Sequence, residues 1–225
     1  MASKKIDIPL QDVILKGDLF HPKNSGGLII FSHGSGSSRL SPRNRSVADY
    51  LKEKGFSTLL FDLLTPIEDQ KKKFRFDIQL QSNRLIHVTK WIKDDARFKK
   101  LNTGFFGAST GAAAAIQAAS MLGEDIIQAI VSRGGRPDLA KKYLSRLSSP
   151  ILLIVGELDE VVLELNEIAY NMISCPKELT LIPNATHLFE EPGTLEEVTY
   201  ATADWFRRYL YWPTIQIKKE FIDER

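Results

Sequence analysis

Runs of apolar residues that end at turn-forming residues recur along the chain, and they alternate with segments in which apolar residues follow a helical spacing. Continuous apolar runs of this kind are typical of strands buried on both faces of a parallel sheet. We predict such strands at residues 27–32, 56–61, 103–106, 126–131, 150–156 and 179–183. The helical spacing predicts helices at residues 42–55, 77–92, 161–173 and 194–209. The alternation predicts an α/β fold with a mostly parallel central sheet flanked by helices.

The two ends of the chain depart from this pattern. Residues 6–20 alternate partly between apolar and polar side chains around a tight turn, which predicts a pair of edge strands within residues 1–26. Residues 213–225 are expected to form a charged C-terminal tail. The sequence shows no internal repeat and no insertion long enough for a separate cap domain. We therefore expect a single domain over residues 1–225.

The composition narrows the class of protein. With 43% hydrophobic residues, 26% charged residues and a formal net charge of +2, the chain suits one well-buried domain. Its single cysteine, Cys175, excludes an internal disulfide and agrees with a reducing compartment. We find no secretory signal, no apolar run of the ~18 residues that a membrane span needs, and no basic patch interleaved with aromatic residues. We therefore expect a cytoplasmic monomer or homodimer that binds neither membranes nor nucleic acid.

The pentapeptide Gly107-Ala108-Ser109-Thr110-Gly111 has the G-x-S-x-G pattern of a nucleophile elbow. It follows an apolar run and opens an alanine-rich segment that favours a helix. In such an elbow the serine occupies a sharp turn between strand and helix, and the glycines keep side chains away from the strained backbone. The pattern predicts that Ser109 is a nucleophile, although a serine capping an ordinary helix would also fit these residues.

The partners that a nucleophilic serine needs follow in the chain order acid, then histidine. Asp159 lies just beyond the predicted strand 150–156, and His187 follows the predicted strand 179–183. Because both lie at the carboxyl ends of later strands, where open α/β sheets gather their sites, we predict that they form a triad with Ser109. Glu160 and, less favoured, Glu157 are alternative acids.

The segment His33-Gly34-Ser35-Gly36 follows the predicted strand 27–32 and indicates an oxyanion loop. One backbone N–H of an oxyanion hole comes from such a loop, and the other comes from the residue after the nucleophile. We therefore predict that the N–H groups of Ser35 and Thr110 are the donors. His33 is interpreted as a ring that orders the loop, since His187 already fills the position of the base.

Four arginines lie close to the predicted site. Arg39 and Arg43 flank the start of the helix 42–55, and Arg133 and Arg136 follow the strand 126–131. If the guanidinium groups face the cleft, they would bind a carboxylate or phosphate of the substrate. The alternative is that they pair with surface acids such as Asp138.

Residues 63–76 carry the charge run Lys71-Lys72-Lys73-Phe74-Arg75. Such a run is usually a solvated loop. Because it follows a strand end, it could instead cover the pocket, with Phe74 or Phe76 as an apolar contact.

With these residues identified, the chain from about Leu28 to Leu210 resembles an α/β-hydrolase of the dienelactone hydrolase-like group. It is most similar to a subgroup whose members also occur joined to phosphoribosyltransferase domains, through stretches that include residues 33–39, 41–45, 60–66 and 132–138. The resemblance implies a sheet of about eight strands, with Ser109, Asp159 and His187 at the triad positions. The namesake enzymes carry a cysteine nucleophile where this chain has Ser109.

These inferences predict a serine hydrolase that cleaves a small ester, thioester or lactone through an acyl-enzyme, without a cofactor. An acyltransferase with the same triad and a non-catalytic binding or regulatory module are the alternatives. The four histidines are scattered without a carboxylate or cysteine at ligand spacing, so no metal site is expected.

Overall fold

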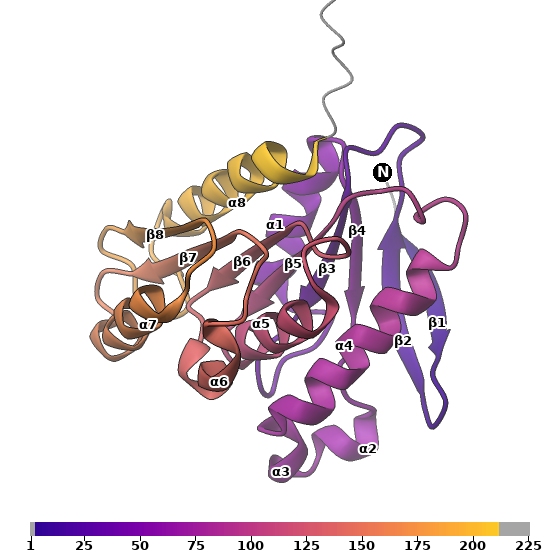
Figure 1. Cartoon of the computed structure of the whole chain (residues 1–225), viewed down its shortest axis with the longest axis horizontal. Helices are drawn as coiled ribbons and strands as arrows, with labels where there is room; N and C mark the ends of the chain where they lie inside the picture. Colours follow the sequence, from indigo (N-terminus) through magenta and orange to yellow (C-terminus); the bar gives the residue numbers. More distant parts are fainter. Residues whose placement is uncertain (1–2, 212–225) are drawn as a thin grey trace, which may run out of the picture.

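The computed structural model describes residues 3–211, which form one eight-stranded sheet with helices on both faces (Figure 1). The strands are β1 (Lys4–Pro9), β2 (Ile14–Phe20), β3 (Leu28–Ser32), β4 (Ser57–Phe61), β5 (Thr103–Ala108), β6 (Ala129–Arg133), β7 (Ile151–Gly156) and β8 (Lys177–Ile182). Their order in the sheet is β1-β2-β4-β3-β5-β6-β7-β8. All pairings from β4 to β8 are parallel, whereas β1 with β2 and β2 with β4 are antiparallel. The predicted α/β fold with a mostly parallel sheet is confirmed.

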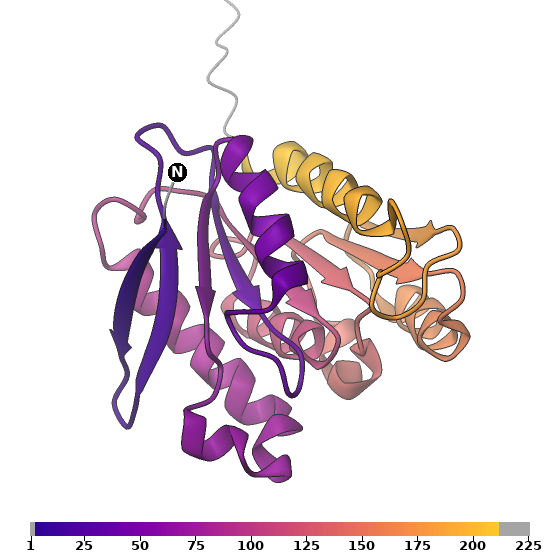
Figure 2. The same ribbon diagram turned by 180° about the vertical axis from the view of Figure 1, so that it is seen from behind.

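The helices form two layers that enclose the sheet. They are α1 (Pro42–Glu53), α2 (Pro66–Asp69), α3 (Lys72–Arg75), α4 (Ile78–Lys93), α5 (Thr110–Leu122), the 3-10 helix η1 (Pro137–Ala140), α6 (Lys141–Leu144), α7 (Glu160–Met172) and α8 (Thr194–Leu210). Helices α4, α5, α6 and α7 contribute to the core on one face of the sheet. Helices α1 and α8 cover the other face, which Figure 2 shows from behind.

The alternation of side chains along the central strands explains the two layers. Leu28 and Ile30 of β3 belong to the core cluster under α4 and α5. Ile29 and Phe31 of the same strand belong to the cluster under α1 and α8. Because successive side chains point to opposite faces of a sheet, a strand covered on both faces needs a continuous apolar run. The apolar runs in the sequence therefore mark the strands at the centre of the sheet.

Three segments differ from the sequence prediction or lie outside the structure. Strand β6 begins at Ala129, because the preceding apolar residues form a turn in which the Ile127 N–H donates to the Gly123 carbonyl at 3.0 Å. Ile127 is fully buried in that turn. Because a buried turn is as apolar as a buried strand, the apolar run predicted a strand that begins too early. Residues 63–76 hold the short helices α2 and α3. The predicted tail at 213–225 lies outside the described residues.

Candidate active site

Ser109 lies at the sharp turn where β5 ends and α5 begins. Its backbone has φ 52° and ψ −123°, a conformation that a residue with a side chain rarely adopts. Such strain costs on the order of 1–3 kcal/mol and persists only where neighbouring structure enforces it. Here the Ser109 N–H donates to the carbonyl of Arg133, and the Ser109 carbonyl accepts from the N–H of Arg136, both at 3.1 Å. The turn that follows β6 therefore holds the strained residue in place.

The two glycines of the pentapeptide are required by close backbone contacts. A Cβ atom at Gly111 would lie 2.2 Å from the carbonyl oxygen of Ser32, and one at Gly107 would lie 2.5 Å from the Cα of Ala112. The first turn of α5 thus packs directly against the end of β3. This contact brings the N-terminal end of α5, which attracts negative charge, next to the loop that follows β3.

His187 and Asp159 contact each other as the sequence predicted. The Nδ1 atom of His187 lies 2.6 Å from Oδ2 of Asp159. Because a carboxylate only accepts hydrogen bonds, Nδ1 is the donor in this contact. Asp159 stands at the start of α7, directly after β7, whereas the carboxylate of the alternative acid Glu157 accepts from the N–H of Asn184 at 3.0 Å. The other alternative, Glu160, is exposed.

The turn at residues 133–135 lies between Ser109 and His187. A Cβ atom at Gly134 would lie 3.4 Å from Cε1 of His187, while the preceding carbonyl accepts from the Ser109 N–H. Among the hydrogen bonds of residues 3–211, none joins the Ser109 hydroxyl to His187. Catalytic hydrogen bonds are often long in unliganded sites and tighten when substrate binds. The structure therefore brings the serine and the His–Asp pair to the same turn.

His33 orders the loop after β3. Its Nε2 accepts from the N–H of Leu63 at 3.0 Å, and its Nδ1 lies 3.0 Å from the carbonyl of Gly34. An acceptor at Nε2 and a donor at Nδ1 require a neutral ring, and burial lowers the pKa of His33 in agreement with that state. The ring links the loop to the residues that follow β4, and both of its nitrogen atoms take part in these contacts.

The predicted donor Ser35 has a different partner from the one expected. Its backbone N–H donates to Oγ1 of Thr110 at 2.8 Å. We predicted that this N–H would be free to donate to an oxyanion, but in the structure it is already hydrogen-bonded. The loop and the first residue of α5, which the sequence predicts as separate donors, are hydrogen-bonded to each other.

Three of the four predicted substrate-binding arginines are paired with acids. Arg39 forms an ion pair with Asp62, and Arg136 donates twice to Asp138 at 2.8 Å. These pairs correspond to the alternative interpretation of surface pairing. Arg43 donates at 2.7 Å to the exposed Glu190, which lies three residues after His187 in the same loop.

Arg133 is the exception, because no acid within residues 3–211 pairs with it. The side chain is buried, with 8% of its residue surface exposed, and its Nη2 lies 3.4 Å from Oδ1 of Asn44. Its guanidinium carbon lies 5.7 Å from the ring centre of Phe189. Among the described residues, Nε and Nη1 have no hydrogen-bond partner. Burial, and secondarily the charge of Arg43, lowers the pKa of Arg133 to about 10, so the group still carries its charge at neutral pH.

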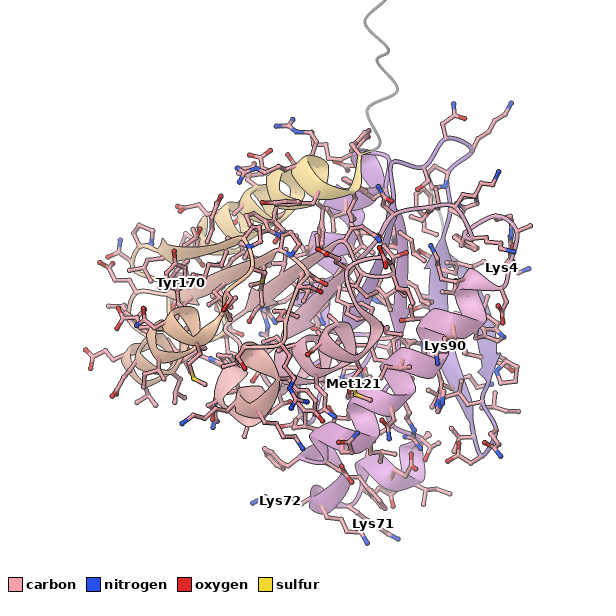
Figure 3. The ribbon with its side chains drawn as sticks, viewed as in Figure 1. Lys4, Lys71, Lys72, Lys90, Met121 and Tyr170 are labelled. Carbon is pink, nitrogen blue, oxygen red and sulfur yellow. The ribbon has the colours of Figure 1, made fainter. Side chains whose placement is uncertain are left out.

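The segment 63–76 contributes an ion pair that sequence reasoning missed. Glu68 on α2 pairs with Arg84 on α4 at 2.6 Å, and Glu68 also forms a capping box with Thr65. The Thr65-x-x-Glu68 spacing before a short helix was the available signal. The lysines of the charge run do not join this site: Lys71 and Lys72 project away from the molecule (Figure 3).

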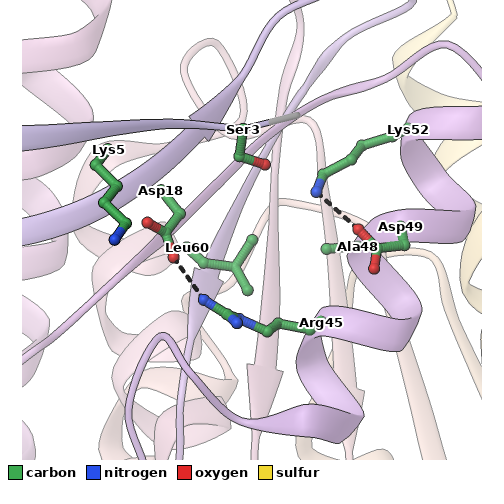
Figure 4. Close-up of a pocket in the computed structure, with 8 residues that line it drawn as sticks. All are labelled: Ser3, Lys5, Asp18, Arg45, Ala48, Asp49, Lys52 and Leu60. Carbon is green, nitrogen blue, oxygen red and sulfur yellow. Dashed lines mark hydrogen bonds and ion pairs between the residues drawn. The ribbon is translucent and has the colours of Figure 1, made fainter. Parts of the chain in front are cut away.

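A separate pocket of about 310 Å³ lies over β1, β2, β4 and α1 (Figure 4). There Arg45 donates to Asp18 at 2.9 Å and Lys52 to Asp49 at 2.8 Å. None of its lining residues belongs to the predicted triad or oxyanion loop.

Within residues 3–211, no group of three or more His, Cys, Asp or Glu side chains is arranged to hold a metal ion. No helix in the same range is both long enough and apolar enough to cross a membrane.

Comparison with known proteins places these features in context. The sequence model of the Dienelactone hydrolase family matches residues 15–214. The crystal structure of a dienelactone hydrolase from Anabaena variabilis has a TM-score of 0.89 and 45% identity, covering 92% of this chain and 98% of that one. Est1E from Butyrivibrio proteoclasticus has a TM-score of 0.78 at 19% identity over 91% of this chain and 98% of its own, which shows a shared fold.

Curated relatives are longer than this chain. A protein of Mycobacterium tuberculosis curated under the name of a putative phosphoribosyl transferase is 48% identical over 213 residues, which cover 95% of this chain and 48% of that protein. The same match is found in a second strain of that organism. The chain thus spans about half the length of the curated relatives it matches.

Proposed function

The chain belongs to the dienelactone hydrolase family, and we propose that it is a serine hydrolase with Ser109 as nucleophile, His187 as general base and Asp159 as the acid that orients the histidine. The family and its solved members support hydrolase activity. The observation that carries the finer assignment is the 2.6 Å contact between His187 Nδ1 and Asp159 Oδ2 beside a strained serine turn.

The proposed mechanism follows from the roles these groups can take. Nε2 of His187 accepts the proton of the Ser109 hydroxyl as its oxygen attacks the carbonyl carbon of an ester. Asp159 stabilises the resulting imidazolium, which then gives the proton to the leaving alcohol oxygen as the C–O bond breaks. Water attacks the acyl-enzyme in the same way, with His187 again as the base, and releases the acid and free Ser109.

The proposed substrate is a small ester, thioester or lactone that carries an anionic group. The insertion after β4 is limited to the two short helices α2 and α3, so within residues 3–211 no cap domain covers the site. Arg133 supports an anionic substrate, because its carbonyl accepts the Ser109 N–H and its charged side chain has no acidic partner within residues 3–211. Arg43, whose acidic partner is exposed, is the second candidate contact.

The proposal is tested by the hydrolysis of short-chain aryl esters, neutral and carboxylate-bearing, by the full chain. Ser109→Ala and His187→Gln should each lower kcat by at least about 10³-fold, because both remove a member of the triad. Asp159→Asn should lower kcat by about 10³- to 10⁴-fold through loss of the correct histidine tautomer. Ser120→Ala, in the last turn of α5, is the matched control and should retain activity. Equal activity of Ser109→Ala and the wild type would contradict the proposal.

A further inference from the structure

Thr110 is the first residue of α5 and directly follows the proposed nucleophile. Its side chain is buried, with 4% of the residue exposed. Its Oγ1 accepts the N–H of Ser35 at 2.8 Å and so joins the loop after β3 to the helix. This hydrogen bond uses a lone pair of the hydroxyl oxygen and leaves the hydroxyl proton available, because a threonine hydroxyl is both a donor and an acceptor.

That proton has no acceptor among the described residues. Two threonines inside other helices of this protein donate to the carbonyl four residues earlier: Thr89 to Leu85 and Thr199 to Leu195, both at 2.7 Å. Thr110 cannot do so, since the residue four positions earlier lies within β5. A buried hydroxyl without an acceptor is costly, so the position calls for an acceptor that arrives with a ligand.

The Thr110 hydroxyl is hydrogen-bonded to the loop that lies against the proposed nucleophile. The loop that reaches Thr110 passes Ser109 closely: a Cβ atom at Gly34 would lie 3.1 Å from Cβ and 3.8 Å from Oγ of Ser109. The backbone N–H of Thr110 belongs to the first turn of α5 and has no carbonyl of that helix to bind. The helix N-terminus adds a partial positive charge at the same place.

We propose that the Thr110 hydroxyl is itself a donor of the oxyanion hole, with the Ser35 N–H polarising it from behind. This inference rests on the proposed hydrolase function. As the bond from Ser109 Oγ to the carbonyl carbon forms, the π electron pair moves onto the carbonyl oxygen. The N–H and O–H of Thr110 both donate to that oxygen, and no proton leaves Thr110. A hydroxyl that accepts a hydrogen bond is a stronger donor, so the Ser35 N–H acts through Thr110.

The opposite role is also testable. If the Thr110 hydroxyl merely occupied the Ser35 N–H and had to swing away before reaction, its removal would free a donor and accelerate hydrolysis. The donor role predicts the reverse, so the sign of the change separates the two.

The experiment compares wild type, Thr110→Val and Thr110→Ser on a short ester. Valine keeps the shape and removes the hydroxyl, whereas serine keeps the hydroxyl. Thr110→Val should lower kcat by about 10²-fold with little change in KM, the loss typical of one oxyanion donor. Thr110→Ser should stay close to wild type. Unchanged or faster turnover by Thr110→Val would overturn the proposal.

A second readout covers the case in which Thr110→Val is poorly folded. The rate ratio between an ester and the matching thionoester reports donation to the carbonyl oxygen, and it does not depend on the fraction of folded enzyme. The ester-to-thionoester rate ratio should be lower in Thr110→Val than in the wild type and unchanged in Thr110→Ser. An equal ratio in all three proteins would overturn the proposal. If the wild type does not hydrolyse esters and Ser109 is unreactive, the proposed hydrolase function itself fails. If the wild type is active and Thr110→Val is equally active, only the proposed role of Thr110 fails.

Discussion

At the scale of single residues, Arg133 is a buried cation near the candidate site that has no acidic partner within residues 3–211. A buried cation without a counter-ion is destabilising, and it is retained only where something else compensates. Its Nη2 has one long contact to Asn44, while the ring of Phe189 covers the guanidinium. We interpret this as stability given up for the binding of an anionic substrate.

Replacement of this arginine should therefore move stability and activity in opposite directions. Arg133→Met should raise the free energy of unfolding by about 1 kcal/mol or more, because an apolar side chain replaces an uncompensated charge. The same variant should lose at least about tenfold in kcat/KM for carboxylate-bearing esters relative to neutral ones. Urea unfolding and paired ester kinetics measure the two effects. Arg97→Met, which removes an exposed arginine paired with Asp95, is the control and should change neither.

Residue-scale contacts are also where sequence reasoning reached its limit. The motif and chain order predicted Asp159 and His187, because strand ends in a parallel sheet gather at one edge. The partners of Ser35 and Arg39 depend on atoms of Thr110 and Asp62, which lie far away in the sequence. No local pattern encodes the direction of one N–H or the acid nearest to one guanidinium.

At the scale of elements, the ion pair between α2 and α4 fixes the segment that follows β4. Arg84 is almost fully buried and donates to both the Glu68 carboxylate and the carbonyl of Leu63. Leu63 is also the residue whose N–H binds His33. The pair therefore supports the ordering of the loop that carries Ser35.

This ion pair makes a definite prediction for acid stability. Hydrogen bonds from Arg84 lower the pKa of Glu68 to about 2, so its stabilisation is complete above the ordinary value of 4.5 and is lost as pH falls toward 2. Glu68→Gln should cost about 1–3 kcal/mol at pH 7, because it leaves the buried Arg84 without its anionic partner. The difference from wild type should shrink below pH 4.5, because protonated glutamate resembles glutamine. Urea unfolding across pH measures it; a difference that is constant with pH would contradict this account.

The prediction of helices and strands from sequence was limited in the same way, because local patterns do not show contacts between distant residues. The central strands and long helices followed from apolar periodicity. The predicted start of β6 was wrong, because the buried turn at Ile127 is as apolar as a strand. Helix α2 is held by the ion pair and capping box of Glu68, and α3 by hydrogen bonds from Gln81 to two of its carbonyls, rather than by apolar periodicity.

At the scale of the whole molecule, the topology of the sheet assembles the candidate site. Strand β5 lies between β3 and β6, so the loop after β3, the serine turn and the turn at residues 133–135 are neighbours. Strand β7 lies beyond β6, and Asp159 follows it. The order of parallel strands therefore brings together residues from four separate segments of the chain. The match covers 48% of each curated relative, so this arrangement corresponds to about half of such a protein.

The central claim is that this assembled site activates Ser109, and covalent labelling tests it most directly. The full chain is treated with a fluorophosphonate probe and the modified residue is identified by mass spectrometry, with Ser109→Ala as the matched protein. The account predicts one adduct, on Ser109, that is absent from the variant and much slower to form in His187→Gln. Folded wild-type protein that remains unlabelled, or that carries the adduct on another residue, would contradict it.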